Sequence, residues 1–137
     1  MKINAEDLEK ARALMPGLFR FNNEMPFSQA VLALNEQELF IYDDHAPDAI
    51  QGEANDEFVY KVKVRIPLNT IETVVDEKIV NQPELAGLDR LSILLAGSPE
   101  TYFFYYFNED KKTSNNFIAG LKHYKVAVQS RKIKLTA

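Results

Sequence analysis

The stretch that decides the fold runs from Tyr60 to Val75 and reads YKVKVRIPLNTIETVV. Apolar residues alternate with Lys and Arg up to Ile66, and a period of two over this length is typical of a half-buried antiparallel strand. Pro67 interrupts the alternation, which indicates an edge, a bend or the start of a strand. The pattern therefore predicts that the chain leaves one strand, turns a corner and begins a second strand at Ile71.

Further apolar segments on both sides of this stretch also have the length of strands. Short polar turns join two pairs of them, which predicts two hairpins. Longer polar connections without periodicity cover residues 43–57 and 76–87. The sequence thus predicts six or seven antiparallel strands. The clearest of them are 30–34, 39–42, 60–66, 71–75, 90–95 and 101–107.

The N-terminal residues predict a short helix. Asn4 followed three residues later by Asp7 is a helix-start signature. Leu8 and Met15 then fall at helical spacing, and the Pro-Gly pair at residues 16–17 ends the pattern. A loose connection is expected to follow this helix.

A second helix is predicted near the C-terminus, beginning around residues 108–110, where acidic side chains suit the positive end of the helix dipole. Beyond it, Ile133 and Leu135 alternate with lysines, so the basic tail 129–137 could add as an edge strand. The apolar stripe expected on the helix consists of Phe117, Leu121, Tyr124 and Val128.

Composition is consistent with one globular domain. The chain has 137 residues, 46% of them hydrophobic, and no cysteine, which excludes disulfides, thiolate metal sites and cysteine nucleophiles. The acidic N-terminus lacks the apolar core of a signal peptide, and no apolar run approaches the length of a membrane span. We therefore expect a soluble, cytoplasmic protein without a transmembrane segment.

Charge is segregated along the chain. Residues 1–110 carry a formal charge of −11, whereas residues 111–137 carry +7 and contain no Asp or Glu. The basic segment is expected to lie against the acidic body of its own or a neighbouring subunit, or to bind an anionic partner. The candidate partner-binding residues are Lys122, Lys125, Arg131, Lys132 and Lys134.

In three motifs the chain resembles bacterial pleckstrin-homology-like (PH-like) and GRAM-like domains. Leu-Phe-Ile-Tyr at 39–42 resembles their second strand, and Ile-Pro-Leu-Asn-Thr-Ile at 66–71 resembles their Ile-Pro-Leu-x-x-Ile strand junction. The aromatic run 102–107 is followed by an amphipathic helix, and this pair resembles the last strand and closing helix of such domains. The resemblance covers residues 28–128. It implies a non-catalytic binding or assembly module, often oligomeric in bacteria, without a fixed ligand site.

The fold expected from pattern and resemblance together is mainly β with flanking helices (α+β). A PH-like antiparallel barrel of six or seven strands is capped by the C-terminal α-helix, and the short N-terminal helix precedes it. Residues 1–137 form this single domain, with the helix and connection at 1–27, the barrel and capping helix at 28–128 and the basic tail at 129–137. The N-terminal helix and the long acidic segment 43–57 depart from the family pattern.

Lys61, Lys63 and Arg65 are the candidate ligand-binding residues. They follow one another on one face of the predicted strand, about 6.5 to 7 Å apart. Phosphoinositide-binding PH domains use a Lys-x-Arg pair on a strand, so the resemblance implies an anionic lipid headgroup as one candidate ligand. Alternatively, nearby acids balance these cations on a solvated strand face.

No other group of residues in the sequence predicts a cofactor. Asp43, Asp44, His45 and Asp48 lack the alternation of a calcium loop, so no metal site is predicted. The aromatic run 102–107 contains no Lys or Arg, which argues against nucleic acid. One face of this run is expected to fill the barrel. The other face packs under the helix or against another subunit, which leads to an oligomer hypothesis.

Two alternatives remain open at this point. The chain could be a small acidic cytosolic inhibitor, such as an immunity protein, or a chaperone-like protein. Either would bind a basic partner through residues 43–57. It could also be an enzyme, with a pocket lined by Tyr and acidic residues near His45 or His123.

Overall fold

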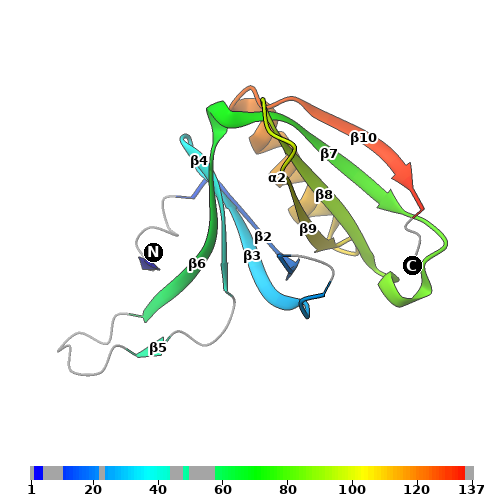
Figure 1. Ribbon diagram of the computed structural model, residues 1–137, viewed down its shortest axis with the longest axis horizontal. Coiled ribbons are helices and arrows are strands. Elements are labelled where there is room, and N and C mark those ends of the chain that lie inside the picture. Colours follow the sequence, from blue (N-terminus) through cyan, green and yellow to red (C-terminus); the bar gives the residue numbers. More distant parts are fainter. Residues whose placement is uncertain (1, 5–10, 22–23, 44–47, 50–57, 135–137) are drawn as a thin grey trace.

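The computed structural model describes residues 2–4, 11–21, 24–43, 48–49 and 58–134 (Figure 1). Eight strands form one mixed sheet in the order β6-β4-β3-β2-β9-β8-β7-β10, and β1 and β5 pair with the first residues of β6. The strands are β1 (Lys2–Asn4), β2 (Ala13–Phe19), β3 (Ser28–Leu34), β4 (Glu38–Asp43), β5 (Asp48–Ala49), β6 (Phe58–Pro67), β7 (Ile71–Ile79), β8 (Leu88–Leu95), β9 (Thr101–Phe107) and β10 (Val128–Ile133); the helices are the 3₁₀ turns η1 (Leu68–Thr70) and η2 (Pro83–Leu85) and the α-helix α2 (Lys111–His123).

The sheet is bent into two halves but is not closed. All neighbouring strands in the described main sheet are antiparallel except β7 and β10, which are parallel. Within the described residues, the terminal strands β6 and β10 do not pair with each other. The prediction of a closed, wholly antiparallel barrel was therefore wrong. The edge of β7 that faces away from β8 is paired with β10, so this edge cannot pair with β6.

The predicted corner after Ile66 is confirmed. β6 ends at Pro67, η1 makes the turn, and β7 begins at Ile71 in the other half of the sheet (Figure 1). The amide of Leu68 donates to the Gln37 carbonyl at 2.9 Å, and the Ala96 amide donates to the Thr70 carbonyl at 2.8 Å. These two bonds tie the turn to both halves of the sheet.

The predicted N-terminal helix was wrong. The described parts of this region, residues 2–4 and 11–21, contain β1 and β2 and no helix, whereas residues 5–10 lie outside the described residues. In β2, Met15 is buried in the core while Leu14 is 40% exposed, which is the alternation of a strand. The spacing of Leu8 and Met15 suits a helix, but Met15 packs as a strand residue.

Gly17 lies where β2 crosses β9, at the seam between the two halves. β2 and β9 share only three residue pairs, from Gly17–Tyr106 to Phe19–Phe104. A Cβ atom on Gly17 would lie 2.0 Å from the Tyr105 carbonyl oxygen and 2.8 Å from the Phe104 ring. The Pro-Gly pair that suggested a helix end is thus part of a close strand crossing that only glycine allows.

The C-terminal helix is confirmed, and it packs its apolar stripe into the main core. Phe117 and Leu121 are fully buried. The helix ends at His123 with Tyr124 as its C-cap, and Lys125 adopts a φ of +63°, a left-handed conformation common just after helix ends. Val128 was expected on the helix but begins β10, so the predicted edge strand in the tail forms. Other members of this core include Met15, Leu32, Ile41, Ile66, Leu91, Ile93, Phe104 and Tyr106.

The expected connection 76–87 is shorter than predicted. β7 continues to Ile79 and β8 begins at Leu88, so the charged residues 76–78 belong to a strand and not to a loop. Their side chains alternate between the two faces of the sheet. This placement brings two polar networks to opposite faces of β7.

Candidate binding surface

The predicted lipid-binding residues of β6 are engaged by acidic residues of β4. The amine of Lys63 lies 3.3 Å from an Asp43 carboxylate oxygen, and the Arg65 guanidinium lies 2.5 Å from a carboxylate oxygen of Glu38. The side chain of Lys61 lies outside the described part of the chain. In Lys63 and Arg65, the positive charge that would hold a phosphate is balanced by a partner on the neighbouring strand.

We expect the double variant Lys63→Ala/Arg65→Ala to bind vesicles containing anionic lipid no more weakly than the unmodified chain. The reason is that these partly exposed ion pairs on a strand face leave little net field for a headgroup. The matched variant Glu38→Ala/Asp43→Ala frees both cations and should raise vesicle binding. Co-sedimentation would check this, and loss of binding in the first variant would contradict it.

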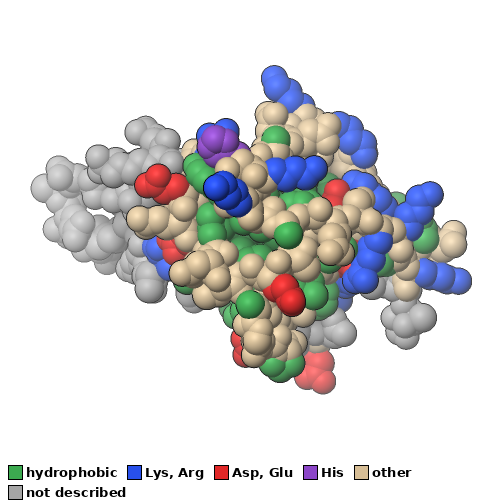
Figure 2. All heavy atoms as spheres, turned by 90° about the horizontal axis from the view of Figure 1, so that it is seen from above, with side chains coloured by type: hydrophobic (Ala, Val, Ile, Leu, Met, Phe, Trp, Pro, Cys, Tyr) green, Lys and Arg blue, Asp and Glu red, His purple; other side chains and the backbone are tan. Residues whose placement is uncertain are grey.

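The predicted partner-binding cations separate into two groups. Lys122 and Lys125 lie at the end of α2, whereas Arg131, Lys132 and Lys134 lie on β10 and just beyond it, and all five residues are exposed. Figure 2 shows Lys and Arg side chains gathered over the end of the molecule that carries β10 in Figure 1. Among the described residues, none forms an ion pair with any of the four lysines.

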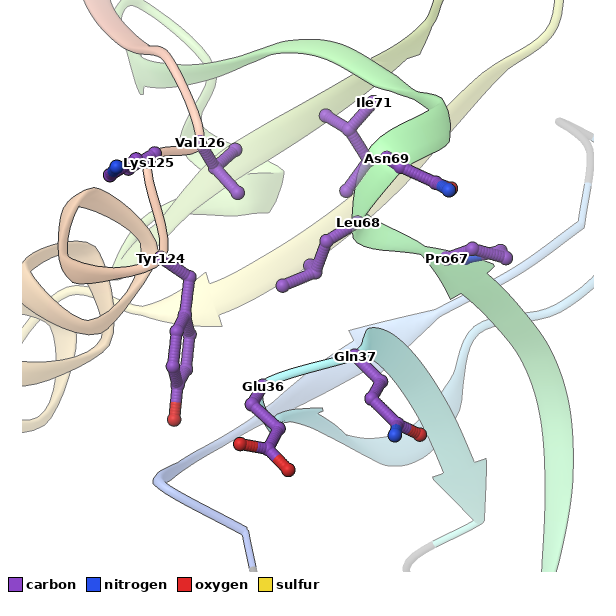
Figure 3. A pocket seen from close by; sticks show the side chains of 9 residues that line it. All are labelled: Glu36, Gln37, Pro67, Leu68, Asn69, Ile71, Tyr124, Lys125 and Val126. Atoms are coloured by element: carbon purple, nitrogen blue, oxygen red, sulfur yellow. The ribbon is translucent and has the colours of Figure 1, made fainter.

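A hollow of about 650 Å³ opens between η1, the β3–β4 turn and the end of α2 (Figure 3). Leu68, Ile71 and Val126 line it with apolar surface. Tyr124 and Glu36 add polar groups on one side, while Lys125 points away from it. Among the described residues that line it, Glu36 is the only carboxylate, and His123 is not one of them. Within the described part of the chain, no side-chain hydrogen bond or ion pair joins the titratable groups that line the hollow, which are those of Glu36, Tyr124 and Lys125.

The aromatic run of β9 is divided between the two faces of the sheet, as predicted, but α2 packs on the face that fills the core and not on the other one. Phe104 and Tyr106 lie in the core under α2, whereas Phe103, Tyr105 and Phe107 point to the opposite side, called here the outer face. Phe103 is 37% exposed and Phe107 is 46% exposed. The outer face of β9 therefore presents large apolar side chains that the helix does not cover.

Arginines and aromatic rings form a continuous row across the outer face. The Arg20 guanidinium carbon lies 4.1 Å from the centre of the Phe27 ring, and Phe27 meets Tyr105 edge-to-face at 5.0 Å. On the other side of Tyr105, the Arg90 guanidinium carbon lies 4.1 Å from the centre of the Phe103 ring. Such cation–π and edge-to-face contacts hold the rings in fixed orientations.

A buried carboxylate anchors the end of this row. Glu77 of β7 is 0% exposed and accepts hydrogen bonds from Arg90 Nε at 2.8 Å and from Ser92 Oγ. Arg131 of β10 donates to the second carboxylate oxygen through Nε at 2.8 Å and Nη2 at 2.5 Å. Burial alone would raise the pKa of Glu77, but the bonds from Arg90, Ser92 and Arg131 outweigh it, and the pKa lies below its ordinary value.

A second polar network lies on the inner face of the same strand. Tyr106 donates to Asp76 at 2.5 Å and accepts from Lys78 at 3.0 Å, and the Lys78 amine lies 3.4 Å from an Asp89 carboxylate oxygen. Burial, followed by the bond to Asp76, raises the pKa of the Tyr106 hydroxyl well above its usual range. Tyr106, Asp76, Lys78 and Asp89 therefore each have a polar partner within this network.

Sequence reasoning identified the basic tail and the two-sided aromatic strand but missed the glutamate that joins them. Glu77 was assigned to a polar connection, so its pairing with Arg90 and Arg131 could not be foreseen. The apolar residues Ile79 and Val80, which follow the charged triplet, were a signal that the strand continues.

The described part of the chain contains no helix long and apolar enough to cross a membrane and no group of three residues suited to hold a metal ion. Comparison of the sequence with protein-family models and with curated proteins gives no match.

Proposed function

We propose that this chain is a non-catalytic binding module of PH-like type that recognises another protein through its outer face. The observation that carries this proposal is the two exposed rings, Phe103 and Phe107, on a sheet face that α2 leaves uncovered, with the guanidinium of Arg90 stacked on Phe103. Aromatic residues and Arg are the side chains that most often dominate the binding energy of protein interfaces.

The order of elements supports the PH-like part of the proposal. Four antiparallel strands (β2, β3, β4 and β6) are followed by three more (β7, β8 and β9) and then by α2, which packs on the sheet. This is the succession that the resembled family uses. The strands β1, β5 and β10 are additions to that plan, and β10 brings basic residues to the margin of the outer face.

The fixed orientation of Arg90 on the outer face supports a role of this face in binding and not only in stabilising the fold. Arg90 is held from below by Glu77 and from the side by Tyr105 and Phe103, so its guanidinium loses little freedom when a partner docks. The exposed cation Arg131 continues the same surface onto β10. The partner is therefore expected to present apolar and acidic side chains together.

Photo-crosslinking tests this proposal in cells of the source organism. A benzophenone amino acid placed at position 103 or 107 should crosslink the chain to one heterologous protein of defined mass. The matched control carries the same group at Phe21, which is 57% exposed but packs its ring against Phe19. Identical products at positions 103 and 21, no product at 103, or a crosslinked dimer of this chain would each contradict the proposal.

A further inference from the structure

We propose that the free edge of β10 binds an extended, acidic segment of the partner protein by adding it to the sheet as a further strand. This inference rests on the proposed function and specifies the chemistry of the partner. β10 is the last strand of the main sheet, and no described residue pairs with its outer side. Edges of this kind bind extended peptides in many recognition domains.

The register of β10 on β7 defines which backbone groups point outward. The amide of Val74 donates to the Ala127 carbonyl at 2.8 Å, and the amide of Val80 donates to the Ile133 carbonyl at 2.9 Å. Backbone groups alternate in direction along a strand, so those of Gln129 and Arg131 also face β7. The N–H and C=O groups of Ser130 and Lys132 consequently face away from the sheet.

The outward edge is rigid enough to receive a strand. Arg131 is held by its two bonds to the buried Glu77, although its side chain remains 59% exposed. The start of the strand is held by Thr73, whose hydroxyl donates to the Ala127 carbonyl at 3.2 Å. A segment that pairs with β10 therefore meets a backbone already in extended conformation, which lowers the entropy cost of binding.

Charge selects the occupant of this edge. Arg131, Lys132 and Lys134 line it. Among the described residues no acidic side chain pairs with the two lysines, whereas Arg131 shares the single carboxylate of Glu77 with Arg90. Two copies of β10 placed edge to edge would bring these cations together, and like charges on paired strands are destabilising. The β6 edge of a second copy carries Lys63 and Arg65, whose charges Asp43 and Glu38 balance, so it offers β10 no net negative charge. An acidic segment is attracted by the cations of β10, whereas a second β10 edge is repelled by them.

Fluorescence anisotropy with synthetic peptides tests the inference on the full chain. The probes are a short peptide alternating Glu and Thr, the same peptide with Lys in place of Glu, and the Glu peptide N-methylated on the residues that would face β10. Only the unmodified Glu peptide should bind. The variant Ser130→Pro, which removes an outward N–H, should bind it about tenfold more weakly than Ser130→Ala.

Ser130→Pro should leave the thermal midpoint unchanged, because the lost N–H makes no bond to β7. If this variant fails to fold, the N-methylated peptide decides the question. Lys132→Glu/Lys134→Glu should abolish binding, whereas the matched pair Lys122→Glu/Lys125→Glu should retain it. No binding by the Glu peptide, or equal binding by its N-methylated form, would overturn strand addition.

The two proposals fail separately. Specific crosslinks at position 103 without peptide binding would preserve protein recognition by the outer face and remove only the role of the β10 edge. Peptide binding without such crosslinks would instead preserve the role of the β10 edge and contradict protein recognition by the outer face.

Discussion

Replacing Gly17 with alanine is expected to destabilise the chain by about 3 kcal/mol or more, as severe overpacking does. The added methyl group would lie 2.0 Å from the Tyr105 carbonyl oxygen. Because that oxygen belongs to the backbone of β9, only separation of β2 from β9 can relieve the contact. Urea denaturation followed by circular dichroism would measure the loss.

Gly120→Ala is the matched control for this prediction. Its added methyl group would lie 2.9 Å from Cδ2 of Leu34, a side-chain atom that can shift further than the backbone oxygen beside Gly17. Alanine also favours the helix more than glycine does by about 1 kcal/mol. We expect a change close to zero for Gly120→Ala. Equal losses in the two variants would show that the β2–β9 crossing is not the sensitive point.

Glu77→Ala is expected to cost about 3 kcal/mol, as the loss of one member of a buried ion cluster typically does. The substitution leaves Arg90 and Arg131 without their shared carboxylate and removes the side-chain link between β8 and β10. The matched control is Glu72→Ala on the same strand, where the side chain is exposed and the cost should be small. Urea denaturation at neutral pH would compare the two.

The contribution of Glu77 to the free energy of unfolding should also depend on pH, and it should decrease as the pH falls. Its pKa is lower in the folded chain than the ordinary value of 4.5, because the bonds from Arg90, Ser92 and Arg131 outweigh the effect of burial. The unfolded chain therefore takes up the proton first, and the stabilisation is present above about pH 4.5 and is lost as the pH falls below it. The stability gap between the unmodified chain and Glu77→Gln should shrink over that range. A gap that stays constant down to strongly acidic pH would contradict the assignment.

The strands that could be predicted from the sequence are those whose pattern is local. Alternation up to Ile66 predicts β6, and the polar turn before Leu39 predicts the β3–β4 hairpin. The corner at Pro67 was also predicted, because proline restricts the backbone regardless of its tertiary surroundings. In these segments, local preference and final packing agree.

The errors arose where a distant partner decides the conformation. Met15 and Gly17 form a strand because β3 and β9 pair with it on either side, and helical spacing could not reveal those neighbours. Val128 leaves the helix because Lys125 turns the chain toward β7. Glu77 looked like a loop residue because its two arginine partners lie 13 and 54 positions away. The periodicity of apolar residues describes one helix or strand at a time and carries no information about contacts between distant segments.

The narrow β2–β9 crossing has a consequence for the speed of folding. Its paired residues Phe19 and Phe104 stand 85 positions apart in the sequence, whereas the β3–β4 and β8–β9 hairpins join near neighbours. Hairpins form within microseconds, but contacts of such long range make the search for the native topology slow. The halves of the sheet should thus acquire structure early, and their docking across this crossing should set the refolding rate.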